Sequence, residues 1–135
     1  MNFIRNIFHN LNSSSTLEEL IVKNSNPKYL GRYRKRIINK LSKQVFICGT
    51  NQKVADQIIK NISLLTTSSP DGEGFVLITF LNQKNLTERN PNAYPIKMDI
   101  YALYTSIDSF DLQGLLIQTD NGWIAFAKDE LKKYS

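Results

Sequence analysis

The chain carries its strongest structural signal in residues 27–49, which read PKYLGRYRKRIINKLSKQVFICG. Pro27 suits the first position of a helix, because its missing N–H would have no partner there, and Asn26 is suited to cap that helix. Apolar side chains then recur at helical spacing, opposite a row of cations. We therefore predict a helix over 27–43, in which Gly31 costs about 1 kcal/mol relative to alanine and must be compensated by packing. The expected apolar face comprises Leu30, Tyr33, Ile37 and Leu41, with Tyr29 and Ile38 beside it.

Short apolar runs outside this segment predict strands. Residues 45–48 are consecutive, largely β-branched or aromatic side chains closed by Gly49, which indicates a buried strand. The runs 62–67 and 75–81 flank the turn residues Ser-Pro-Asp-Gly and predict a hairpin. A second hairpin is predicted over 115–126, because Asn-Gly between two apolar runs is the strongest short hairpin signal.

Other segments show helical periodicity or helix caps. We predict helices at 2–11, from a cap at Ser15 or Thr16 through Leu20 and Ile21 to 24–26, from a cap at Thr50 or Asn51 through Val54, Ile58 and Ile59, around Leu86, from a cap at Asp99 through Ile107, and over 128–134. Asn90, Pro91, Asn92 and Pro95 mark a loop. The resulting order of elements predicts the α+β class, with N-terminal helices packed on a mainly antiparallel mixed sheet.

The length of 135 residues fits one domain, since two independent cores would each be too small. We expect residues 1–16 to form an amphipathic helix and a Ser-rich linker, and 17–135 to form the single α+β domain. The terminal helix could dock on the domain, lie on a membrane surface or serve as a targeting segment.

The charge of the chain is divided unequally between its two halves. Residues 1–70 contain eleven Lys or Arg and three acids, a net charge of +8, whereas 71–135 contain six and nine, a net charge of −3. There is no acid between Glu19 and Asp56, where nine cations fall. A field of this kind favours an anionic partner.

The cationic face of the predicted helix is the candidate partner-binding site. Its members are Lys28, Arg32, Lys35, Arg36 and Lys43. An acidic protein surface could pair with them, and nucleic acid is the alternative, in which the cations neutralise phosphates and Tyr29 or Tyr33 stacks on bases. A merely solvated helix face is the third interpretation. No helix-turn-helix, zinc knuckle or ribonucleoprotein motif accompanies the charge.

The residues that usually carry catalysis are scarce. His9 is the only histidine, which excludes sites built from several His ligands, and Cys48 is the only cysteine and falls within an apolar run. Gly72 and Gly74 lack the third glycine and the lysine of a phosphate-binding loop. The acids Asp71, Glu73, Asp108 and Asp111 do not have the spacing of a calcium loop. We therefore expect a protein that is not an enzyme and that needs no metal or cofactor.

The sequence indicates a cytoplasmic protein. It contains no apolar run long enough to span a membrane and no secretory signal at its N-terminus. One cysteine forms no intrachain disulfide, which is compatible with a reducing compartment.

Between residues 17 and 134 the chain resembles the N-terminal domain of the SseB-type family. The resemblance begins with Leu17, Leu20, Pro27, Tyr33, Ile37, Leu41, Val45, Phe46, Ile47 and Gly49, and continues through 72–81 with Leu86, 99–116 and 123–131. It implies a bacterial α+β domain used as a regulatory or interaction module, without catalytic residues to carry over. An immunity-type protein that blocks a toxin and a regulatory adaptor both fit this expectation.

Overall fold

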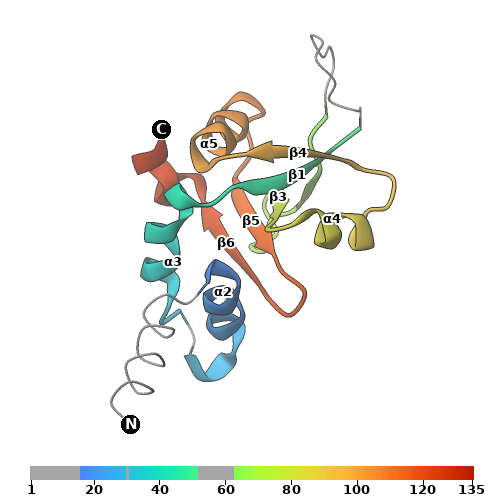
Figure 1. Cartoon of the computed structure of the whole chain (residues 1–135). Helices are drawn as coiled ribbons and strands as arrows, with labels where there is room; N and C mark the ends of the chain where they lie inside the picture. The colour runs from blue at the N-terminus through green and yellow to red at the C-terminus, as the bar shows by residue number, and fades with distance from the viewer. Residues whose placement is uncertain (1–15, 30, 52–62) are drawn as a thin grey trace.

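A mixed β-sheet forms the centre of the structure (Figure 1). The computed structural model describes residues 16–29, 31–51 and 63–135, and in these residues six strands pair in the order β4-β1-β3-β5-β6, with β2 also on β3. The strands are β1 (Phe46–Thr50), β2 (Thr66–Ser68), β3 (Phe75–Phe80), β4 (Tyr94–Met98), β5 (Gly114–Gln118) and β6 (Trp123–Ala127). Only the β3–β5 pair among them is parallel. The α+β class and the mainly antiparallel mixed sheet are confirmed.

Helices cover the two faces of this sheet unequally. The described helical elements are α2 (Leu17–Ser25), α3 (Arg34–Lys40), α4 (Gln83–Arg89), α5 (Ile100–Ser109) and the 3-10 turns η1 (Pro27–Tyr29), η2 (Leu41–Lys43) and η3 (Lys128–Tyr134). Figure 1 shows α4 apart from the others, across the sheet from η3 and α3. The main core joins α2, α3, α5 and η3 to one face of the sheet, whereas Leu86 of α4 packs with Ile47 and Phe80 in a smaller cluster.

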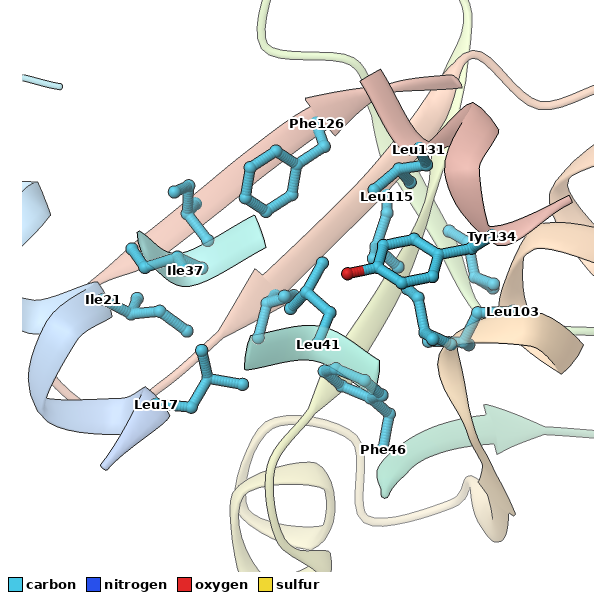
Figure 2. Packing of buried hydrophobic residues seen from close by; sticks show 14 of the residues in the cluster. Leu17, Ile21, Ile37, Leu41, Phe46, Leu103, Leu115, Phe126, Leu131 and Tyr134 are labelled. Atoms are coloured by element: carbon cyan, nitrogen blue, oxygen red, sulfur yellow. The ribbon is translucent and has the colours of Figure 1, made fainter. Parts of the chain in front are cut away.

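The main core is built from side chains that the helical and strand patterns bring to one face. Figure 2 shows Ile21 and Ile37 beside Phe126, and Leu41 between Phe46 and Leu115. Each of these side chains is almost or completely buried. Burying apolar area at roughly 25 cal/mol per Å² is the main force that holds the helices on the sheet.

Local hydrogen bonds confirm the predicted caps at Thr16 and Asp99, and both predicted hairpins are present. Thr16 Oγ1 accepts from the N–H of Glu19 at 3.1 Å, and Asp99 Oδ1 accepts from that of Ala102 at 2.8 Å. In the second hairpin, the N–H of Thr119 donates to the carbonyl of Gly122 at 2.8 Å. The first hairpin is also present, although β2 is shorter than the predicted run 62–67.

The predicted continuous helix over 27–43 is wrong. The segment contains the 3-10 turn η1, a break at Gly31 with φ +71°, the helix α3 from Arg34 to Lys40 and the 3-10 turn η2. A right-handed helix requires negative φ, so the backbone at Gly31 turns away from the helix axis. Asn26 does cap the first turn, since its Oδ1 accepts from the N–H of Lys28 at 3.0 Å.

Smaller corrections concern strand ends and the last helix. Val45 is 51% exposed and precedes β1, which extends instead to Thr50, so Thr50 does not begin a helix. Pro95 lies in the outer strand β4, where its missing N–H is tolerated, and not in a loop. The C-terminal helix predicted over 128–134 is the 3-10 turn η3. The helices predicted over 2–11 and through Val54, Ile58 and Ile59 lie outside the described residues.

The outer edge of β6 is closed by side chains of other elements. The Ser25 hydroxyl accepts from the N–H of Trp123 at 3.1 Å, Arg34 Nη2 donates to the carbonyl of Ala125 at 2.6 Å, and the N–H of Ala127 donates to Glu130 Oε1 at 3.0 Å. Free strand edges invite pairing with other chains. These three bonds therefore protect β6 from adding another strand.

Substitution of Gly31 tests the break, because the sign of the change in stability distinguishes a continuous helix from a left-handed turn. In a continuous helix, Gly31→Ala would stabilise the protein by about 1 kcal/mol. At φ +71° we expect it to destabilise the protein by about 1–2 kcal/mol, although a Cβ there would meet no atom within 4 Å. Urea unfolding measures the change. Thr105→Ala, at an exposed position of α5, is the control and should be neutral or slightly stabilising.

Candidate functional site

The five cations predicted as a partner-binding site are all exposed, but they do not form one helical stripe. Lys28 lies in η1, Arg32 in the turn after Gly31, Lys35 and Arg36 in α3, and Lys43 at the end of η2. Within the described part of the chain none of the five forms an ion pair with an acid. We call these residues, together with Lys23 of α2, the basic surface.

Two tyrosines organise one end of the basic surface. The rings of Tyr29 and Tyr33 meet edge to face with their centroids 5.8 Å apart. Lys28 lies 5.7 Å from the Tyr29 centroid, and Lys23 and Arg36 lie 6.0 and 5.9 Å from the Tyr33 centroid. Each cation–π contact contributes about 0.5–1 kcal/mol at an exposed site. The structure therefore gathers Lys23, Lys28 and Arg36 around the two tyrosine rings.

The other cations extend away from this cluster. Lys35 lies on α3, whose 7 residues span roughly 10 Å, and Lys43 follows the helix at the end of η2. The basic surface thus takes its cations from consecutive elements between the end of α2 and the start of β1, and three of them gather at the two tyrosines.

Arg34 is a cation of the same segment with a different role. Its Nε and Nη2 donate to Glu130 at 3.0 and 2.7 Å, its Nη2 also contacts the carbonyl of Ala125, and its guanidinium lies 4.5 Å from the Phe126 ring centroid. The Arg34 hydrogen bond lowers the pKa of Glu130. Sequence analysis counted Arg34 only as one of the nine cations between Glu19 and Asp56, because Glu130 is 96 residues away and no local pattern pairs them.

The candidate catalytic groups that the structure describes are buried or bound to other groups of the protein. Cys48 is fully buried in β1, and burial raises the pKa of its thiol to about 12. Asp108 pairs with Lys128, and the backbone N–H of Glu73 binds Asp71 and lowers its pKa. No group of three potential metal ligands forms among the residues with described positions. His9 lies outside them.

Two hollows of similar size open on the surface. One, of about 440 Å³, lies between the end of β1 and the loop after α4, where Arg89 donates to the carbonyl of Thr119 at 3.3 Å. The buried amide of Asn85, without a hydrogen-bond partner among the described residues, is not part of its wall. The other, of about 420 Å³, lies between the end of α2, Gly31 and Trp123, directly beside the basic surface.

Trp123 is the main residue of this region that sequence reasoning missed. It was assigned only to a hairpin strand, yet its side chain is 47% exposed. Its position in an alternating strand pattern was the available signal, because Ile124 and Phe126 point to the core and their neighbours therefore point away.

Comparisons with known proteins bring no further information on this surface. No family model, curated protein or solved structure matches the chain. No helix in the described ranges is both long and apolar enough to cross a membrane.

The Arg34–Glu130 pair predicts a pH-dependent contribution to stability. A depressed carboxyl pKa contributes stability that is present above the unfolded-state value, roughly pH 4, and is lost as the pH falls through the folded-state value. We expect Glu130→Gln to lower the free energy of unfolding by about 1 kcal/mol at neutral pH, and by progressively less below pH ~4. Urea unfolding across this pH range measures the difference.

The control for this experiment is Asp120→Asn in the exposed β5–β6 turn. Asp120 has no ion pair with a described residue. Its substitution should change stability little at any pH. A Glu130→Gln effect that stays constant between neutral and acidic pH would contradict the assigned pairing.

The burial of Cys48 predicts an unreactive thiol. At about pH 8, a thiol with a pKa of about 12 has a thiolate fraction on the order of a thousandfold smaller than a free cysteine has. We expect labelling by a disulfide reagent to be slower by at least this factor in the native protein than in urea. Rapid stoichiometric labelling of the folded chain would show that Cys48 is accessible.

Proposed function

We propose that this chain is a non-catalytic binding module whose basic surface recognises an acidic surface of a protein partner. The observation that carries the proposal is that all six exposed cations of the basic surface lack an ion pair within the described residues. Four other cations, Arg34, Lys84, Lys128 and Lys132, do pair with acids of the chain itself. The cations of the basic surface are therefore available to pair with acidic groups of an external partner.

The arrangement of the tyrosines favours protein over nucleic acid. Single-stranded nucleic acid binds where aromatic rings are free to stack on bases. Tyr29 and Tyr33 are half-buried, meet each other edge to face and have Lys23, Lys28 and Arg36 near their faces. Carboxylates of a protein need no free ring, since they pair directly with the cations.

A binding role also agrees with the placement of the reactive groups. The only cysteine is buried and its thiol pKa is raised, which argues against nucleophilic catalysis. A regulatory or interaction module of the SseB type, acting in the cytoplasm as an adaptor or as an immunity-type inhibitor, is the form of the proposal that the sequence resemblance supports.

Reversal of three cations tests the proposal. We expect the wild-type chain, used as bait in a nuclease-treated extract of its native cells, to recover one protein in stoichiometric amount. Lys28→Glu, Arg32→Glu and Lys35→Glu together should reduce that recovery at least tenfold, because opposite charges at an interface set both association rate and specificity. Quantitative mass spectrometry of the eluates measures the change.

A matched triple variant separates local charge from net charge. Lys84→Glu, Lys97→Glu and Lys132→Glu change the net charge equally, at exposed positions of α4, β4 and η3. This variant should recover the partner as the wild type does. Equal recovery by all three baits would contradict the proposal. Binding that is seen only in an extract without nuclease treatment would favour nucleic acid.

A further inference from the structure

The hollow beside Trp123 lies where four parts of the chain meet. Its walls come from the end of α2, from the turn at Gly31 with Arg34, from Pro70 in the β2–β3 loop, and from Trp123 and Ala125 of β6. It has a volume of about 420 Å³, and a Cβ on Gly31 would meet no atom within 4 Å, so the hollow is open on that side. This volume is sufficient for a large side chain of a partner.

Several polar groups in the wall are already bound within the protein. Asn24 Oδ1 accepts from the N–H of Tyr33 at 3.3 Å, and the Ser25 hydroxyl accepts from that of Trp123 at 3.1 Å. The Arg34 guanidinium is held by Glu130 and by the carbonyl of Ala125. An occupant therefore meets mainly the half-exposed indole ring, Pro70 and Ala125, which favour an apolar group.

Two cations of the basic surface adjoin residues of the hollow in the chain. Lys23 directly precedes Asn24 of the wall, and Arg32 directly follows Gly31. Neither cation has an ion pair among the described residues, and no carboxylate lines the hollow. A segment that enters here is therefore favoured if acidic residues flank its apolar side chain.

We infer that this hollow holds a single apolar side chain, flanked by carboxylates, from the acidic protein partner. The inference rests on the proposed function and adds the chemistry of the bound segment. Trp and Arg at a packed, water-excluding centre with charges around it are typical of binding hot spots. The basic surface then accelerates encounter, and the hollow prolongs the complex.

A second copy of the chain fits the hollow less well than a different protein. Phe110 is 48% exposed and lies between Asp108 and Asp111, so the described residues contain a segment of the required kind. Asp108, however, is already paired with Lys128 of its own chain, so only Asp111 is left to meet the cations of another copy. A partner whose flanking carboxylates are both unpaired fits the hollow better.

Two labelled peptides of equal length and equal Asp and Glu content test the inference. One has leucine at its centre and the other has serine. We expect the full-length chain to bind the leucine peptide at least about fivefold more tightly, as measured by fluorescence anisotropy. Because Trp123 is the only tryptophan of the chain, the leucine peptide should also shift its emission to shorter wavelength.

Two variants locate the difference between the peptides. Trp123→Ser removes one wall, and Ala125→Leu fills the hollow while Trp123 and all charges remain. Each should abolish the preference for leucine, so that the leucine peptide binds no more tightly than the serine peptide. Equal affinities of the wild type for both peptides, or a preference that persists in both variants, would overturn the inference.

The charge variants distinguish failure of this inference from failure of the proposed function. The Lys28, Arg32 and Lys35 reversal should weaken both peptides, and the Lys84, Lys97 and Lys132 reversal should weaken neither. If both peptides bind equally yet still require the basic surface, only the inference about the hollow fails. If neither peptide requires the basic surface for binding, the proposed function fails as well. Self-association that Phe110→Ser abolishes would identify a second copy as the occupant and overturn the inference.

Discussion

The position of Arg34 is the constraint on which the rest of this surface depends. One guanidinium joins α3 to the carbonyl of Ala125 on β6, to Glu130 of η3 and to the ring of Phe126 in the core. A planar group with donors along two edges can satisfy several acceptors at once, which an ammonium group does less well. Because this contact holds α3 against the edge of the sheet, the neighbouring cations Lys35 and Arg36 are directed to solvent.

Much of the fold could be predicted from local sequence patterns. The periodic apolar residues of α5, the cap at Asp99 and the Asn-Gly turn of the β5–β6 hairpin are each short-range signals, and each was confirmed. The break at Gly31 was not predicted, because a glycine inside an amphipathic pattern is compatible with a strained helix and with a left-handed turn. The choice depends on how η1 and α3 meet the sheet, and no local pattern contains that information.

The candidate site could be predicted in composition but not in arrangement. The acid-free run of cations was visible in the sequence, and its members are exposed as expected. Their grouping around Tyr29 and Tyr33, the different role of Arg34 and the hollow at Trp123 all depend on contacts between residues far apart in the chain. Such contacts follow from the packing of α2 and α3 on β6, which charge counts do not describe.

The closed edge of β6 limits how a partner can be recognised. A protein that adds a strand to a sheet needs free backbone N–H and carbonyl groups, and on β6 the N–H of Trp123, the carbonyl of Ala125 and the N–H of Ala127 are bound by Ser25, Arg34 and Glu130. At the other edge, β4 has Pro95, which has no N–H to donate, and the exposed Lys97, and both residue types discourage strand addition. At these two edges, recognition is therefore expected to use side chains. Exposed cations by themselves contribute mainly to the association rate, so a long-lived complex needs an apolar contact near them. In the described parts of the chain, the hollow at Trp123 is the apolar surface that directly adjoins the basic surface.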